Sequence, residues 1–84
     1  MNNRFVLTQA ESMATRLKNH TDDPHERIRL SFLLCYGRVP DARERKAAES
    51  FLSQFPASGS DPEMQALTTY CHSLLASAEF RYLN

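Results

Sequence analysis

Residues 22–44 read DDPHERIRLSFLLCYGRVPDARE, and this stretch predicts a helix, a tight turn and the start of a second helix. Asp23 is suited to be the N-cap of the first helix, with Pro24 at its first position. Glu26 follows the cap by three residues, as in a capping box in which Asp replaces the usual Ser or Thr. Gly37 stands where a left-handed C-cap residue is expected, so the helix should end just before it.

The turn between the two helices contains signals of its own. Pro40 disfavours helix at the residue before it, and Asp41 with Glu44 repeats the Asp-x-x-Glu start signal. Arg38 lies just past the helix end, where it could pair with Glu44, reach Glu79 or contact a ligand, and we favour a structural ion pair or a cap on the last carbonyls. The candidates for structural turn and ion-pair residues are Gly37, Arg38, Pro40, Asp41, Glu44 and, in the C-terminal tail, Glu79.

The helix before the turn carries apolar side chains on more than one face. One face is formed by Ile28, Phe32 and Cys35, and another by Leu30, Leu33 and Leu34. A helix that is apolar on several sides is normally surrounded by other elements. We therefore expect this helix in the middle of the domain.

Two further helices follow from apolar spacing on either side of this stretch. The first is expected from about Arg4 to Lys18, capped by Asn2 or Asn3. Its inward stripe consists of Val6, Ala10, Met13 and Leu17, widened by Phe5. The helix after the turn should end at Pro56. Its inward face consists of Ala47, Ala48, Phe51, Leu52 and Phe55.

The C-terminal part of the chain predicts a fourth helix and a tail. Asp61 is the expected cap and Pro62 the first residue, and the helix should run through about Ser77. Its inward stripe consists of Met64, Leu67, Cys71, Leu74, Leu75 and Ala78. The tail contains Phe80, Tyr82 and Leu83, and we expect it to fold back so that these large apolar groups are covered.

These elements predict one all-α domain over residues 1–84, a compact four-helix bundle-like fold with a docked C-terminal tail. The 84 residues are 42% hydrophobic and carry ten basic and ten acidic side chains, with a pI near 6.8. Because these charges cancel, the protein has no net electrostatic attraction to nucleic acid or to anionic lipid. No apolar run reaches the ~20 residues that a membrane crossing needs, and the N-terminal residues do not resemble a signal peptide.

Cofactor and metal motifs are incomplete in this sequence. Residues 68–72, TTYCH, end in the Cys-His pair of a c-type haem site, but Thr68 occupies the place of the first thiol. His20, His25 and Asp22 could serve as metal ligands together with Asp23, yet Asp23 is better used as a helix cap. We therefore expect no cofactor and no metal.

The two cysteines, Cys35 and Cys71, lie inside helical patterns, where free cysteine behaves as a small apolar side chain. We favour buried free thiols. A disulfide between them remains open, because the sequence does not place their Cα atoms within bridging range.

The sequence gives little support for catalysis and only weak support for DNA binding. The chain has no nucleophile elbow and no glycine-rich phosphate loop, and it contains only two glycines, which favours a non-enzymatic role. The two helices around the turn could instead form a helix-turn-helix, with Arg43, Arg45 and Lys46 on its second helix. Asp41, Glu44 and Glu49 are interleaved with these bases and neutralise that face, for example by pairing Arg45 with Glu49.

Three segments together resemble the C-terminal part of a planctomycete-specific domain of unknown function (planctomycete-specific domain one). They are residues 1–17, MNNRFVLTQAESMATRL; residues 27–52, RIRLSFLLCYGRVPDARERKAAESFL; and residues 67–84, LTTYCHSLLASAEFRYLN. The chain departs from the family pattern at Ser77-Ala78, where Asn is frequent, and at Asp41, where Thr is common. The resemblance covers nearly all of the chain.

The resemblance implies a fragment of a longer, extracytoplasmic protein of the kind that also carries cytochrome-c-like domains. The family has no assigned activity, so it supplies no catalytic residue. Combined with the missing chemical motifs, it predicts a non-enzymatic structural or protein-interaction module. Its partners would be other domains of its parent chain or another protein, without nucleic acid or membrane, and its oligomeric state stays open.

Overall fold

Four helices follow one another in the computed structural model, which describes the backbone of residues 3–83 and the side chains of residues 4, 5 and 7–78. They are α1 (Asn3–His20), α2 (Pro24–Tyr36), α3 (Ala42–Gln54) and α4 (Pro62–Leu83), and the described residues contain no strand. The predicted all-α, four-helix fold is confirmed. The described helices include none with the length and apolar character that a membrane crossing requires.

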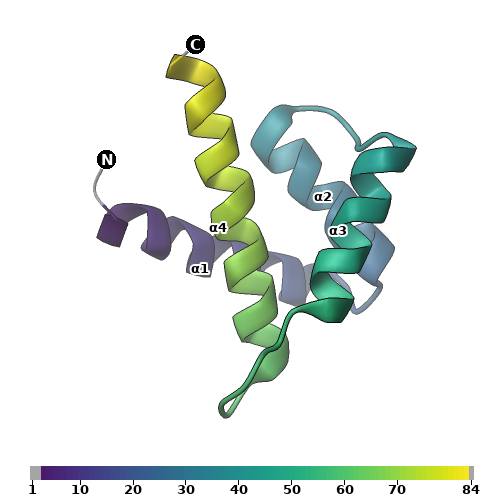
Figure 1. Cartoon of the computed structure of the whole chain (residues 1–84), viewed down its shortest axis with the longest axis vertical. Coiled ribbons are helices and arrows are strands. Elements are labelled where there is room, and N and C mark those ends of the chain that lie inside the picture. The colour runs from purple at the N-terminus through teal and green to yellow at the C-terminus, as the bar shows by residue number, and fades with distance from the viewer. Residues whose placement is uncertain (1–2, 84) are drawn as a thin grey trace.

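Helix α4 crosses α1, while α2 and α3 stand beside this pair (Figure 1). The packing between α1 and α4 is the most extensive in the domain, and α2 contacts each of the other three helices. Among the described residues α1 and α3 do not contact each other. The predicted central place of α2 is therefore correct, although α4 shares it, because α4 also contacts the other three helices.

The helix ends are fixed by local hydrogen bonds. Asp41 and Glu44 form a complete capping box, in which each side chain accepts from the other residue's backbone N–H. Asp61 accepts from the N–H of Met64, as predicted for a cap. Asp23 also caps its helix, but it accepts from His25 at 3.1 Å and not from Glu26, so the capping box predicted there is wrong.

Gly37 ends α2 with φ of 71°, in the left-handed region that side-chain-bearing residues avoid. The predicted C-cap is therefore confirmed. Its N–H donates to the Leu33 carbonyl, which satisfies one of the carbonyl groups left open at the helix end.

The core forms where α1, α2 and α4 meet and extends to α3. Its fully buried apolar members are Ala10, Ala14, Leu17, Ile28 and Cys71, joined by the nearly buried Phe32, Ala48, Leu67 and Tyr70. The two alanines present only methyl groups, which lets α1 approach its neighbours closely. Met13, Leu74 and Leu75 pack against this core from its edge.

Two predicted core positions are wrong. Phe5 is 57% exposed, since the N-terminal turns of α1 extend past α4 (Figure 1), and Ala47 is exposed on α3. The side chain of Val6 and the cap at Asn2 or Asn3 lie outside the described residues. The chain also does not fold back after Ser77, because α4 continues as helix to Leu83. The side chains of Phe80, Tyr82 and Leu83 are not among those described.

Candidate functional site

The turn between α2 and α3 is held by a two-point ion pair. Nη1 and Nη2 of Arg38 donate to Oε1 and Oε2 of Glu44, each at 2.8 Å, and Nη1 also donates to the Val39 carbonyl at 3.2 Å. Oε1 of Glu44 accepts in addition from the Asp41 N–H at 3.0 Å. One carboxylate therefore caps α3 and fixes the arginine that follows α2, as expected for a structural role of this turn.

The Arg38 guanidinium also lies near two aromatic rings of α2. Its central carbon is 5.8 Å from the ring centre of Phe32 and 5.7 Å from that of Tyr36, within the range of cation–π attraction. The hydrogen bond with Glu44 raises the pKa of Arg38 further above its ordinary value. The alternative partner Glu79 has a side chain outside the described residues.

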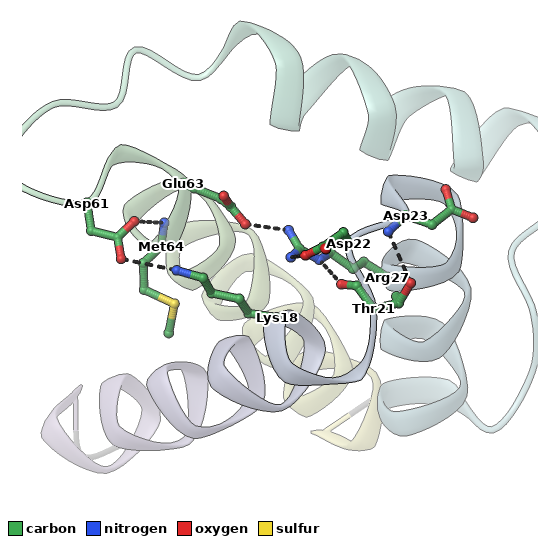
Figure 2. Close-up of polar contacts among 8 residues, drawn as sticks. All are labelled: Lys18, Thr21, Asp22, Asp23, Arg27, Asp61, Glu63 and Met64. Carbon is green, nitrogen blue, oxygen red and sulfur yellow. Dashed lines mark hydrogen bonds and ion pairs between the residues drawn. The ribbon is translucent and has the colours of Figure 1, made fainter.

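A second polar cluster connects the loop after α1, the start of α2 and the start of α4 (Figure 2). We call it the Arg27 cluster; its members are Thr21, Asp22, Arg27 and Glu63. The Arg27 side chain is only 8% exposed, and its Nη1 lies 2.8 Å from Oε1 of Glu63. Its Nε donates to the Thr21 carbonyl at 2.7 Å, and its Nη2 lies 3.6 Å from Asp22. Two nitrogens of this buried guanidinium thus donate hydrogen bonds, and the third has an ion-pair partner at 3.6 Å.

A neighbouring ion pair joins α1 to the start of α4 (Figure 2). Lys18 lies 3.3 Å from the Asp61 carboxylate, whose other oxygen caps the N–H of Met64. The hydrogen bond from Met64, followed by that from Lys18, lowers the pKa of Asp61. Both side chains are substantially exposed, so this pair is screened by water more strongly than Arg27 and Glu63 are.

Two hydroxyl groups meet in the core between α2 and α4. The Ser31 hydroxyl donates to the Ile28 carbonyl at 2.6 Å and lies 2.7 Å from the Tyr70 hydroxyl. Because the single serine proton is used on the carbonyl, Tyr70 is the donor of the second bond. Burial raises the pKa of Tyr70 well above its ordinary range. The pair therefore serves packing and not proton transfer near neutral pH.

Both cysteines are free thiols. Cys71 is fully buried and Cys35 is partly buried; burial raises the pKa of Cys35 to about 11 and, together with a smaller effect of Cys35, that of Cys71 to about 12. His72 is exposed on α4. Cys71 and His72 therefore lie on different faces of one helix, and protonated thiols are weak nucleophiles.

The histidines near the first loop are engaged with separate acidic partners. His20 lies 3.7 Å from Glu26, and His25 lies 3.0 Å from Glu49 on α3. Asp22 and Asp23 are occupied by Arg27 and by the cap of α2. Within the described residues, no three His, Cys, Asp or Glu side chains are grouped as a metal site.

The basic residues of α3 are exposed and partly neutralised. Arg45 lies 3.8 Å from Glu49, in the predicted pairing at helical spacing. Arg43 and Lys46 are exposed on the same helix. The α2–turn–α3 unit thus has the order of a helix-turn-helix, with acidic groups among its bases.

An open groove runs along the C-terminal half of α2 and reaches α4. Its lining includes Leu33, Leu34, Cys35, Arg38 and Ala78. Leu34 is 39% exposed, and Val39, on the turn, is 51% exposed. Two large apolar side chains are thus accessible, Leu34 near the end of α2 and Val39 on the turn that the Arg38–Glu44 pair holds.

The Arg27 cluster and the Ser31–Tyr70 pair were missed by sequence reasoning. A signal was present, since Arg27 and Ser31 are spaced four residues apart and form a polar row on a helix that is otherwise apolar on several faces. A polar row on a central helix indicates buried polar contacts. The identity of the partners, Glu63 and Tyr70, depends on the approach of α4 and has no local signal.

Comparisons with protein-family models, with curated proteins and with solved structures gave no match. The resemblance to the planctomycete-specific domain therefore stays a prediction. What the geometry itself provides is a turn held by an ion pair, an open groove lined by polar and apolar side chains, and a set of polar side chains that hold helices together.

Proposed function

We propose that this chain is a non-enzymatic structural or protein-interaction module of a larger, secreted-type planctomycete protein, where it contacts other domains of its parent chain or another protein. The observation that carries the proposal is the open groove beside the Arg38–Glu44 turn, in which Leu34 remains 39% exposed. Accessible apolar groups on a rigid frame are typical of surfaces that bind other proteins.

The use of the charged side chains also supports a non-enzymatic role. Asp23, Asp41 and Asp61 cap helices, Glu44 clamps the turn, and Arg27 holds three segments together. Catalytic groups usually combine a shifted pKa with access to a cleft. Tyr70 and Cys71, whose pKa values are raised, are buried in the core. Cys35 lines the groove, but burial raises the pKa of its thiol to about 11, which keeps it in the weakly nucleophilic protonated form near neutral pH.

The test is co-purification of the chain with the segments that flank it in its parent gene, expressed separately. We expect association that Leu34→Glu weakens at least tenfold. Ser50→Glu is the matched control, because it adds the same charge at an exposed position on α3. Far-UV circular dichroism must show that both variants are folded. Absence of any association, together with turnover of a small molecule by the chain, would contradict the proposal.

DNA binding through α3 is the second candidate, favoured by exposed Arg43 and Lys46 after the α2–α3 turn. A mobility-shift titration with duplex DNA at low salt tests it. Retention that falls with salt and is lost in the Arg43→Glu/Lys46→Glu variant would support this candidate. We expect no retention at micromolar protein, since ten acidic side chains balance the ten basic ones.

A further inference from the structure

The Arg38 guanidinium keeps one edge unused in the ion pair that holds the α2–α3 turn. Both N–H groups of Nη1 are engaged, one with Glu44 and one with the Val39 carbonyl, and one N–H of Nη2 donates to the other oxygen of Glu44. Among the described residues, the N–H of Nε and the second N–H of Nη2 have no acceptor. These two groups lie on the same edge of the guanidinium and point in parallel, which is the arrangement that binds both oxygens of a carboxylate.

This edge is held in place and is accessible. Glu44 fixes the guanidinium from the other edge, and its central carbon lies 5.8 Å from the ring centre of Phe32 and 5.7 Å from that of Tyr36. The Arg38 side chain is nevertheless 44% exposed, and it lines the open groove at the end of α2. A guanidinium that a first carboxylate has already ordered loses little conformational entropy when it binds a second acceptor.

The rest of the groove lining carries no charge. Among the described residues that line it, Arg38 is the only ionic side chain, whereas Leu33, Leu34 and Ala78 supply apolar surface. We propose that the groove binds a segment of a partner protein in which an acidic side chain stands next to a large apolar one. The carboxylate accepts from Nε and Nη2 of Arg38, and the apolar side chain covers Leu34. This inference rests on the proposed function and names the chemistry of the partner.

The charges at the turn favour a carboxylate over a phosphate group. Glu44 already neutralises Arg38, and Asp41, whose backbone N–H donates to Glu44, adds a second negative charge close by. A phosphate monoester carries about −1.5 to −2 charges, so these two carboxylates repel it more strongly than they repel a single carboxylate. Because an exposed ion pair contributes little by itself, the apolar contact with Leu34 has to supply part of the affinity.

The experiment is an NMR titration of the isotope-labelled chain, in which the Nε–H signal of Arg38 reports directly on the unused edge. The probe is an acetylated and amidated peptide with the sequence Leu-Glu-Leu between flanking glycines, at low salt. The control probe has Gln in place of Glu. We expect the Glu peptide to shift the Arg38 signal and the backbone signal of Leu34, and the Gln peptide to bind at least fivefold more weakly.

Arg38→Lys tests the two-donor edge, because lysine keeps the positive charge but lacks the planar pair of N–H groups. It should bind the Glu peptide no more tightly than the wild type binds the Gln peptide. Arg43→Lys is the matched control, since Arg43 is exposed on α3 and does not line the groove, and it should bind as the wild type does. Circular dichroism checks that both variants fold; if Arg38→Lys does not, the wild-type Arg38 signal decides.

An Arg38 signal that stays unchanged at millimolar Glu peptide would overturn the inference, and so would equal affinities for the Glu and Gln peptides. An equal shift with inorganic phosphate or with a short DNA duplex would also overturn it, in favour of a phosphate site. The proposed function can fail separately. If Leu34→Glu weakens the association with the flanking segments and Arg38→Lys does not, the interaction module stands and only the acidic ligand is wrong. If the flanking segments do not associate although the Glu peptide binds at Arg38, the edge stands and the proposed partner is wrong.

Discussion

The Arg27 cluster offers a quantitative test of how the domain is held together. Arg27 is 8% exposed and its partner Glu63 is 54% exposed, so the pair is neither buried nor fully hydrated. A hydrogen bond to a charged group contributes about 1.5–3 kcal/mol, whereas an exposed ion pair contributes about 0–1 kcal/mol. With one partner buried and a 2.8 Å contact, we expect a coupling of about 1–1.5 kcal/mol between the two side chains.

The measurement is a double-mutant cycle of Arg27→Met and Glu63→Ala, with unfolding free energies from urea titrations followed by far-UV circular dichroism. Glu63→Ala should cost about 1.5–2 kcal/mol in the wild-type background, since it also removes a carboxylate from the first turn of α4. In the Arg27→Met background only the helix-terminal part, about 0.5 kcal/mol, should remain. Methionine is chosen because it keeps most of the buried stem.

The neighbouring Lys18–Asp61 pair is the control, because it connects the same part of α4 but is exposed on both sides. Its coupling should be close to zero and should decrease further in salt, while that of Arg27 with Glu63 should persist. A coupling below about 0.3 kcal/mol for Arg27 and Glu63 would refute the reasoning, since it would mean that water replaces the carboxylate without loss.

Three further predictions concern the core, the turn and pH. Phe32→Ala should cost about 3–5 kcal/mol and Leu74→Ala about 1–2 kcal/mol in urea titrations, because Phe32 is nearly buried and Leu74 only partly; equal costs would contradict this placement. Gly37→Ala should cost about 1–2 kcal/mol from its positive φ alone, since a Cβ there meets nothing within 4 Å; an unchanged melting temperature would be inconsistent with the left-handed cap. Burial raises the pKa of Cys71 from about 9.0 in the unfolded chain to about 12 in the folded one. The contribution of this thiol to the free energy of unfolding is therefore complete below pH 9 and is lost as the pH rises toward 12. Urea titrations between pH 8 and 11 in reducing buffer should show stability falling by about 1.4 kcal/mol per pH unit above 9 from this thiol, a slope that Cys71→Ala removes.

The parts of the fold that were predictable from sequence are those with a local cause. Asp41 with Glu44 and Gly37 act within one turn of their own position, and their spacing alone predicts where helices begin and end. The Arg38–Glu44 pair was also predictable, because its members lie six residues apart across one tight turn. The inward stripe of α4 was predictable from the spacing of its apolar residues, which recur every three or four positions.

The rest depended on long-range packing or on a misjudged local signal. The burial of Arg27 requires Glu63, 36 residues further along, and no local pattern relates the two. The exposure of Phe5 depends on how far α1 extends past α4. The fold-back predicted after Ser77 gave too much weight to covering Phe80 and Tyr82, although residues 78–83 contain neither Gly nor Pro to end the helix.

The pairing of α1 with α4 has a consequence for the synthesis of this protein on the ribosome. Lys18 and its partner Asp61 are 43 residues apart, so at about 5–20 residues per second the first helix is made seconds before the helix that covers it. During that interval Ala10, Ala14 and Leu17 have no α4 to pack against, and a nascent chain stalled before Pro62 would still present them. We expect such a chain to be a substrate for chaperones, and the domain to reach its native packing only after α4 has left the exit tunnel.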